Sequence, residues 1–180
     1  AGQYRVGEFA SRDVSGSYQA AADVLVAHNS IINPQGHGID VGSLRGQKHA
    51  GVVRNASPER ITVANNLITG KETTLINNED SRNVKWQNNL VWPRGVAQAG
   101  FADPGISEAD PKLSRHGVRY VPGPYSPTRN AASILPEVAT DYSGRERSEP
   151  TDIGSDEAFD PGHVRTPLRP IDVGPSWSRK

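Results

Sequence analysis

Three segments of the chain share one pattern and align without a gap. They are residues 24–31, 61–68 and 84–91, and each has apolar side chains at its first, third and eighth positions and Asn at its sixth. Apolar residues two apart face one side of a β-strand, and Asn is favoured where the backbone bends into a left-handed conformation. Each segment is therefore predicted to form a strand, a sharp corner and a second strand.

The spacing of these segments predicts a parallel β-helix. The first two begin 37 residues apart and the last two 23 residues apart, and the smaller offset is about one coil of such a fold. The larger offset is then one coil with an inserted loop. Stacked coils would place Asn29, Asn66 and Asn89 above one another, where their amides hydrogen-bond along the stack. The alternative is an antiparallel sandwich whose strands end in Asn-rich turns.

The same alignment gives a place to two other side chains. His28 occupies the corner position held by Asn65 and Asn88, so it is interpreted as a corner residue rather than a base. Trp86 aligns with Val26 and is predicted to lie in the core.

Composition divides the chain near Trp92. Ten of the eleven Asn lie before this residue, whereas twelve of the fourteen Pro lie after it. Proline removes hydrogen bonds from a β-ladder, so residues 1–92 are predicted to form the coils. Residues 93–157 are predicted to be an irregular segment that closes the same β-helix over the end of the stack. Residues 158–180 are predicted to be an extended, Pro-rich tail.

Composition also excludes several classes of protein. With 34% hydrophobic residues, 18 Gly and 14 Pro, a helical bundle is disfavoured. Twenty basic residues balance twenty acidic ones, so no global field draws the chain to nucleic acid or an anionic membrane. Cysteine is absent, which excludes disulfides and thiolate sites. No apolar run approaches the roughly 18 residues that cross a bilayer. Because the chain starts at Ala1 and lacks Met, we expect a processed chain or a piece of a longer one.

The insertion from Ser43 to Arg60 is the first candidate binding segment, and it contains a single acid, Glu59. A basic loop on a neutral β-helix suits an acidic polysaccharide, because the planar fork of Arg matches a carboxylate bidentately. The alternative is a solvated loop whose charges keep the protein soluble. The candidate side chains are Arg45, Lys48, His49, Arg54 and Arg60.

A second candidate cluster lies near the start of the chain. Arg5 and Arg12 are close in sequence to Tyr4 and Tyr18. An aromatic face can stack on a sugar ring while a nearby Arg binds its carboxylate. The alternative is that both arginines pair with neighbouring acids.

Titratable side chains elsewhere give weaker signals. His37 and His49 lie in loop-like surroundings, where either could transfer protons at neutral pH. Four acids near the C-terminal end are predicted to pair with Arg145 or Arg147 rather than to bind a metal, so no metal site is assigned. These acids are Asp141, Asp152, Asp156 and Glu157.

Roughly residues 15–157 resemble part of a known family. Segments 18–33, 38–42 and 61–68 resemble the later coils of the parallel β-helix polysaccharide lyases that group alginate lyases with chondroitinase B. The segment after Trp92 carries short motifs whose order is similar to that at the C-terminal end of many secreted right-handed β-helices. The motifs are Asp110-Pro111-Lys112-Leu113, Ser126-Pro127, Asp141-Tyr142-Ser143-Gly144-Arg145-Glu146-Arg147 and Asp152-Ile153-Gly154-Ser155-Asp156-Glu157.

The resemblance implies a right-handed parallel β-helix and cleavage of a uronate-containing glycan by β-elimination. In the family a Lys acts as the base, an Arg assists, and a calcium ion held by Asn and Glu residues often neutralises the carboxylate. Those residues lie on coils before the ones that align here. The catalytic residues, and any calcium ion, are therefore expected outside this chain, on a preceding part or on a separate N-terminal fragment, and no cofactor is assigned to this chain.

The resemblance also implies a secreted or periplasmic location. The expected partner is an acidic polysaccharide, alginate first and dermatan or chondroitin sulfate second. This chain would be the C-terminal part of the lyase, which extends the substrate groove and closes the helix. The alternative is a non-catalytic β-helix adhesin or carbohydrate-binding module.

Overall fold

The computed structural model describes residues 21–42, 46–49, 52–53, 57–80, 82–116, 119–147 and 149–157. These residues form strands, bridges, turns and bends, and none of them is helical; accordingly, no described segment is a helix able to span a membrane. The strands are β1 (Ala22–Ala27), β2 (Ser30–Ile32), β3 (Ile39–Val41), β4 (Lys48–His49), β5 (Val52–Val53), β6 (Glu59–Ala64), β7 (Leu67–Gly70), β8 (Thr74–Asn78), β9 (Val84–Gln87), β10 (Asn89–Pro93), β11 (Gln98–Gly100), β12 (Ile106–Glu108), β13 (Leu113–His116) and β14 (Arg119–Pro122).

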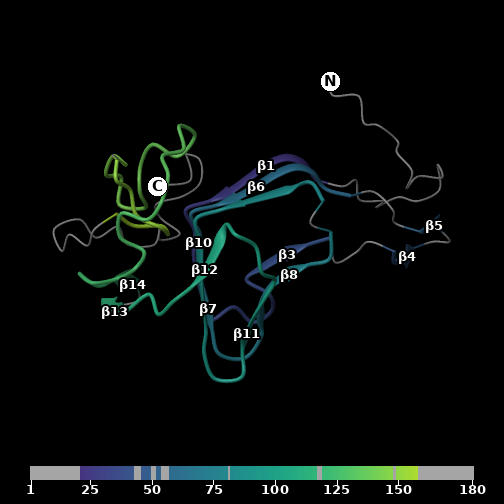
Figure 1. Ribbon diagram of the computed structural model, residues 1–180, viewed down its shortest axis with the longest axis horizontal. Helices are drawn as coiled ribbons and strands as arrows, with labels where there is room; N and C mark the ends of the chain where they lie inside the picture. The colour runs from purple at the N-terminus through teal and green to yellow at the C-terminus, as the bar shows by residue number, and fades with distance from the viewer. Residues whose placement is uncertain are drawn as a thin grey trace, which may run out of the picture.

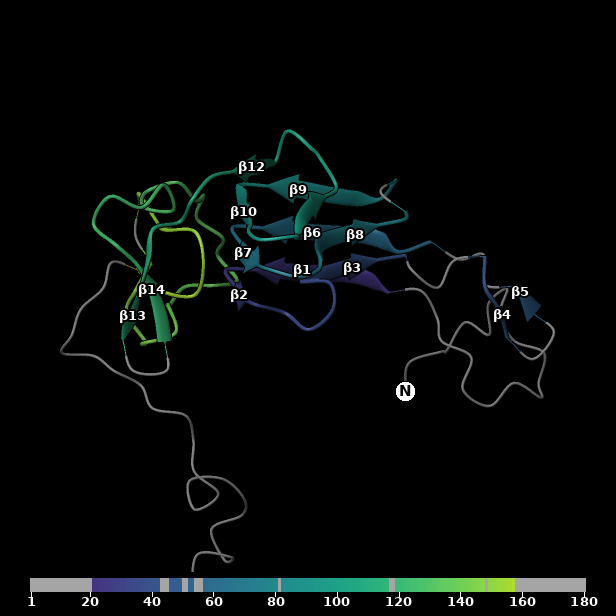
Figure 2. The ribbon, with the colours of Figure 1, turned by 90° about the horizontal axis from the view of Figure 1, so that it is seen from below.

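Three parallel sheets form the body of the molecule. Sheet A has the order β1-β6-β9, sheet B the order β12-β10-β7-β2, and sheet C the order β11-β8-β3. The sheets are three sides of a triangle when viewed along the stack (Figure 1), and the coils lie one above another in the perpendicular view (Figure 2). In Figure 1 the chain runs counter-clockwise from sheet A to sheet C while it advances toward the viewer, so the winding is right-handed. The parallel pairing confirms the predicted β-helix for these strands.

The register follows the spacing of the sequence repeat. In sheet A, Val26 pairs with Val63, and Val63 pairs with Trp86. In sheet B, Ile68 pairs with Val91 of the next coil. The 37-residue coil is longer because the segment between β3 and β6 carries the antiparallel hairpin β4–β5.

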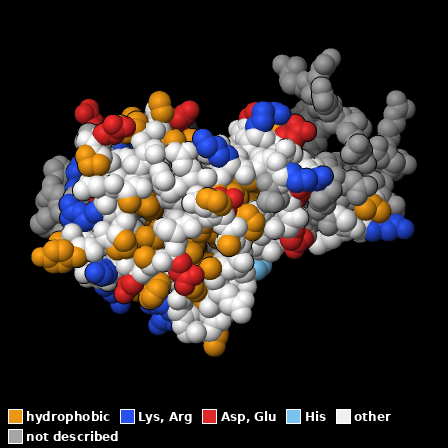
Figure 3. All heavy atoms as spheres, in the orientation of Figure 1, with side chains coloured by type: hydrophobic (Ala, Val, Ile, Leu, Met, Phe, Trp, Pro, Cys, Tyr) orange, Lys and Arg blue, Asp and Glu red, His pale blue; other side chains and the backbone are white. Residues whose placement is uncertain are grey.

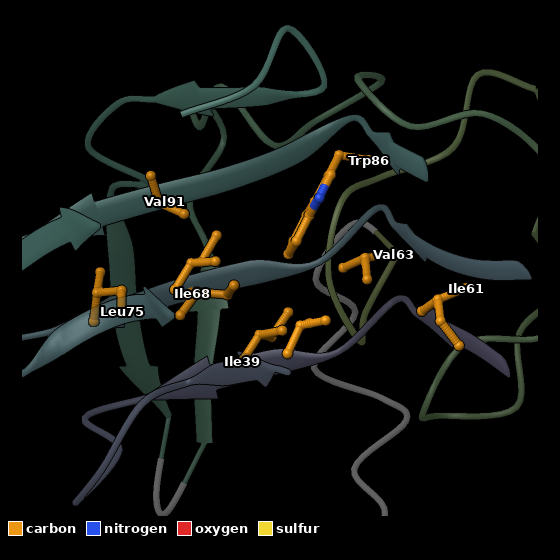
Figure 4. Close-up of a cluster of buried hydrophobic side chains, with 9 residues drawn as sticks. Ile39, Ile61, Val63, Ile68, Leu75, Trp86 and Val91 are labelled. Atoms are coloured by element: carbon orange, nitrogen blue, oxygen red, sulfur yellow. The ribbon is translucent and has the colours of Figure 1, made fainter. Parts of the chain in front are cut away.

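Inward-facing side chains of the three sheets fill the coils. In Figure 4, the side chains of Ile39 and Leu75 from sheet C and of Ile68 from sheet B lie together inside the coils. The ring of Trp86 is buried and lies 5.4 Å from the ring of Phe101, measured between centroids. The buried cluster consists of Ile39, Val41, Ile61, Val63, Ile68, Leu75, Ile76, Trp86 and Val91.

The corner between sheets A and B has the same backbone conformation in each coil. His28, Asn65 and Asn88 have φ values of 52°, 57° and 50°. This left-handed region is tolerated by Asn better than by most residues. His28 is thus a corner residue, as the alignment indicates.

Directly after each corner residue comes an Asn whose amide belongs to a continuous stack. The Nδ2 of Asn29 donates to Oδ1 of Asn66, and the Nδ2 of Asn66 donates to Oδ1 of Asn89, each over 2.9 Å. The same two oxygens accept the backbone N–H of Asn29 and Asn66. The Nδ2 atoms of Asn66 and Asn89 also donate to the carbonyls of Val26 and Val63 over 2.8 Å. The side-chain amides of Asn66 and Asn89 are fully buried, and their hydrogen bonds to protein atoms take the place of hydrogen bonds to water.

Coil pairing continues beyond Trp92. Strand β11 pairs with β8, and β12 pairs with β10, both in parallel. The change of composition near Trp92 therefore precedes the last paired strand of the coils, which ends at Glu108. We call residues 109–157 the closing segment.

The closing segment lies beside the stack, on the outer face of sheet B (Figures 1 and 2). Ile153 packs against Leu67 and Leu90 of that face, and the N–H of Gly154 donates to the carbonyl of Asn65 over 2.9 Å. This position differs from the expected cover over the end of the stack. The reason is that the outer face of sheet B is itself apolar and needs burial. Hydrophobic side chains remain visible at the third-coil end of the stack (Figure 3).

Two arginines hold the closing segment together. The guanidinium of Arg147 is almost fully buried and lies 2.5 Å from a carboxylate oxygen of Glu157. Arg145 lies 2.8 Å from the buried carboxylate of Asp141. Burial lowers the pKa of Arg147, and the charge of Glu157 opposes that effect. These two acids pair with Arg145 and Arg147 as predicted.

His28 is buried beneath the closing segment. Its Nε2 lies 2.9 Å from Nδ2 of Asn65. The same Nδ2 donates to the carbonyl of Ser133, whose N–H donates to Oδ1 of Asn65, so the amide can only donate to the imidazole. Burial, followed by the nearby charge of Arg147, lowers the pKa of His28 from 6.5 to about 4. The folded corner therefore requires a neutral ring.

Asn66→Ala tests the amide stack. The substitution leaves the N–H of Asn29 and the carbonyl of Val26 without their partners, and each unsatisfied buried group costs about 1–3 kcal/mol. We expect the free energy of unfolding, measured with denaturant, to fall by about 2–5 kcal/mol. The control is Asn77→Ala, because the amide of Asn77 bonds at an exposed position and should cost about 0.5 kcal/mol or less. Equal losses in the two variants would contradict a structural role for the stack.

His28→Asn tests the buried corner histidine. Because the pKa of His28 is lower in the folded state than its ordinary value of 6.5, the unfolded state binds the proton more tightly. The stability that the neutral ring contributes is complete above pH 6.5 and is lost as the pH falls toward 4. The total loss in the free energy of unfolding has an upper limit of about 3 kcal/mol. The Asn variant, which has the residue of the other two corners, should lack this loss in denaturant titrations across that pH range. A parallel decline of both proteins would show that His28 does not titrate on unfolding.

Candidate functional site

A groove on the outer face of sheet A gathers basic side chains from two neighbouring coils. Its volume is about 350 Å³, near the lower end of the range for ligand sites, about 300–1,000 Å³. We call it the basic groove. It is lined by Arg60, Ile61, Thr62, Arg82, Asn83, Val84 and Lys85.

Strand alternation points two of these side chains outward. Ile61 and Val63 are buried in the core, so Thr62 between them faces the other side of the sheet. Thr62 pairs in register with Lys85, which is exposed directly before the buried Trp86. Neighbouring coils therefore place a hydroxyl beside an ammonium group.

Arg60 forms one side of the groove and is held by acids. Its Nε and Nη2 donate to the two carboxylate oxygens of Asp23 over 2.5 and 2.8 Å, and its Nη1 donates to Glu59 over 2.9 Å. The hydrogen bond with Asp23 raises the pKa of Arg60, and the same bond lowers the pKa of Asp23. All three side chains are largely exposed, so these pairs orient Arg60 more than they stabilise the fold.

Arg82 connects the groove to the base of the insertion. Its Nε donates to Oδ1 of Asp80 over 3.0 Å, and its Nη2 donates to the hydroxyl of Ser57 over 2.6 Å. The side chain of Asp80 is 1% exposed, whereas most of Arg82 is exposed. The hydrogen bond to this carboxylate raises the pKa of Arg82. A fixed, charged guanidinium therefore faces solvent beside the groove.

Lys85 is the cation best placed to meet a ligand. Among the residues that the structure describes, its ammonium group has no hydrogen-bond or ion-pair partner. Arg60 and Arg82 line the same groove, and their guanidinium groups are oriented by Asp23 and Asp80. Cations, a hydroxyl and an amide in one groove suit the binding of carboxylates, because charge-assisted hydrogen bonds are stronger than neutral ones.

The residues predicted from the sequence are only partly brought into this site. Lys48 is exposed in β4 and does not line the groove. The side chain of His49 lies outside the described part of the structure. His37 is exposed, with Nδ1 2.8 Å from the carbonyl of Thr74, so that nitrogen carries a hydrogen. The other predicted binding residues, which lie outside the described part of the chain, are Arg45, Arg54, Arg5, Arg12 and Tyr18.

Two of the three basic residues that line the groove were not predicted from the sequence. Lys85 carried a usable signal, because it follows Val84 in the repeat just as Thr62 follows Ile61 and must face outward. Arg82 carried none, since it precedes the repeat unit and reaches the groove through its bond to Asp80.

A metal site does not fit the described residues. No group of three or more His, Asp or Glu side chains among them could hold an ion. Of the acids discussed above, Asp152 accepts the N–H of Asn130 over 2.8 Å, and Asp156 pairs with Arg119 instead of with Arg145 or Arg147. No step of a reaction is therefore assigned to a metal on this part of the chain.

Comparison with known proteins gives the family. The family model described as Chondroitinase B matches residues 11–134, and no curated protein matches the chain. Among solved structures, the chain is similar to one titled "Structure of PL6 family alginate lyase AlyGC", with 20% sequence identity and a TM-score of 0.45. That match covers 88% of this chain and 18% of the other, so the chain spans less than a fifth of that structure. Because the family model covers more than half of the residues, the chain belongs to the chondroitinase B family.

Proposed function

We propose that the chain is the C-terminal part of a polysaccharide lyase that acts on an acidic, uronate-containing glycan, alginate first and dermatan or chondroitin sulfate second. The observation that carries the proposal is the basic groove, which Arg60, Arg82 and Lys85 line together. Carboxylates repeat along such a glycan, and the groove presents cations from two neighbouring coils. Family membership supports the lyase reaction.

In this proposal the chain binds substrate and the bond is broken elsewhere. In β-elimination a cation neutralises the C6 carboxylate, a base removes the C5 proton, and the bond from C4 to the linking oxygen breaks as the C4–C5 double bond forms. Arg60, Arg82 and Lys85 would hold carboxylates of sugar units beside the one that reacts. We propose that the insertion residues Arg45, Lys48 and Arg54 also bind the glycan.

The exposed edges of the first coil favour the presence of further coils before it, which would carry the catalytic residues. Strands β1, β2 and β3 are each the last strand at one end of their sheets. Val24, Val26 and Ile31 of this coil are only partly buried, whereas Val63 and Ile68 of the second coil are fully buried. Further coils stacked on these edges would cover the apolar side chains and pair the strands. They would carry the catalytic Lys, on the same chain or on a separate fragment secreted or exported with it.

Product formation tests the proposal against its alternative, a β-helix module that binds glycans without cleaving them. The full protein that contains this chain is incubated with alginate, and the ultraviolet absorbance of the unsaturated product is followed. Growth of this absorbance supports the lyase. If alginate, dermatan sulfate and chondroitin sulfate all remain intact while alginate binds, the binding module is the better account.

Charge variants test the basic groove itself. Lys85→Gln should weaken the affinity for an alginate tetrasaccharide about fivefold, since one ion pair at 4 Å in water is worth about 1 kcal/mol. Asp23→Asn should strengthen it, because Arg60 loses a competing carboxylate and Asn tolerates the positive φ of this position. Both changes should shrink at high ionic strength.

The matched control is Lys71→Gln, which removes an exposed Lys outside the basic groove. Titration calorimetry at low and high salt gives all four affinities. If Lys71→Gln weakens binding as much as Lys85→Gln does, the glycan does not bind in the groove.

A further inference from the structure

A second hollow lies between the first coil and the closing segment. It adjoins the outer face of sheet B, beside which the closing segment stands in Figures 1 and 2. Its volume is about 360 Å³. We call it the seam cleft. Its lining includes Ser30 and Asn33 of the first coil and Arg119, Tyr120, Tyr142 and Asp156 of the closing segment.

One wall of the seam cleft is fixed by hydrogen bonds between the two parts. The N–H of Ser155 donates to the hydroxyl of Ser30 over 3.0 Å, and the N–H of Tyr142 donates to the carbonyl of Ser155 over 2.8 Å. At Gly154, which has a φ of 101°, an added Cβ would lie 2.7 Å from the Ser30 hydroxyl. Only glycine allows this close approach. The cleft is therefore preformed rather than a loose gap.

Arg119 and Asp156 make the centre of the cleft polar and electrically neutral. Arg119 Nη2 donates to Oδ1 of Asp156, whose side chain is 6% exposed. The other carboxylate oxygen accepts the hydroxyl of Ser155 over 2.9 Å. A carboxylate ligand would have to compete with this buried acid for the guanidinium. The remaining N–H groups and lone pairs suit neutral hydroxyl groups.

Two tyrosines give the cleft an apolar surface. The guanidinium carbon of Arg119 lies 4.9 Å from the ring centroid of Tyr142, yet Tyr142 is 45% exposed and Tyr120 is 38% exposed. An aromatic ring with a polar edge is favoured at sites that are apolar on one side and wet on the other. A pyranose unit has this character, with C–H groups on its faces and hydroxyls around its rim.

We propose that the seam cleft binds a sugar unit through its uncharged parts, as a second glycan site separate from the basic groove. A ring face of the sugar packs on Tyr142 and Tyr120, and its hydroxyls bond to Arg119 and Asp156. This binding does not depend on the sugar carboxylate and is insensitive to salt. The choice of a glycan as ligand rests on the family and the proposed function, but binding in the cleft needs no cleavage.

The test uses an alginate tetrasaccharide whose carboxylates have been reduced to alcohols. This neutral probe cannot form ion pairs with the basic groove, so binding that is insensitive to salt and is weakened by Tyr142→Ala is assigned to the seam cleft. Ligand-observed NMR titration of the chain should detect binding that is unchanged at high salt and unchanged by Lys85→Gln. Tyr142→Ala should weaken it by roughly tenfold, and Tyr142→Phe should retain it.

Two further variants keep the result interpretable. Tyr120→Ala should also weaken binding, so the conclusion does not depend on the folding of one variant. Tyr125→Ala is the control, because Tyr125 is 84% exposed and does not line the cleft. Absence of binding by the neutral probe, or equal binding to the Tyr142→Ala and Tyr125→Ala variants, overturns the proposal. Failure of the lyase proposal would instead appear as intact polymer, whatever the neutral probe does.

Discussion

The whole arrangement depends on one constraint, the burial of the primary amides of Asn66 and Asn89 at the turns from sheet A to sheet B. Such a group costs free energy unless both its donor and its acceptor positions are filled. In the three coils this is possible only when equivalent residues lie directly above one another, because Asn29 bonds to Asn66, Asn66 bonds to Asn89, and the amides of Asn66 and Asn89 also bond to the backbone of the preceding coil. The amide stack thus fixes the register, since a slip of one residue would leave several buried groups without partners.

Both candidate sites follow from that register. Once the corners are aligned, the outward positions of sheet A are aligned too, which brings Thr62 beside Lys85 in the basic groove. On the neighbouring sheet the same corners present polar groups to the closing segment, as Asn65 does to Ser133 and Gly154. The closing segment is thereby held against the first coil, and the seam cleft forms where the two meet.

The coils could be predicted because their sequence repeats. The parts of the chain without a repeat could not be predicted. The apolar alternation and the Asn after each corner predicted the strands, their neighbours and the lengths of the coils. The place of the closing segment could not be predicted, because its contacts join residues far apart in sequence, such as Ser155 with Ser30. The pairing of Asp156 with Arg119 could not be predicted for the same reason. The groove combines Arg60, from the end of the basic insertion, with Lys85, whose neighbours in the repeat are uncharged and so gave no charge cluster to recognise.

The register between the second and third coils can be measured directly, because the chain has no cysteine of its own. In a double variant with Thr62→Cys and Lys85→Cys, the two sulfurs lie on paired residues of neighbouring parallel strands and should form a disulfide under mild oxidation. Moving the second cysteine two residues along the strand, with Gln87→Cys in place of Lys85→Cys, should prevent it. Mass spectrometry quantifies both products, and preferential cross-linking of the displaced pair would contradict the stacked coils.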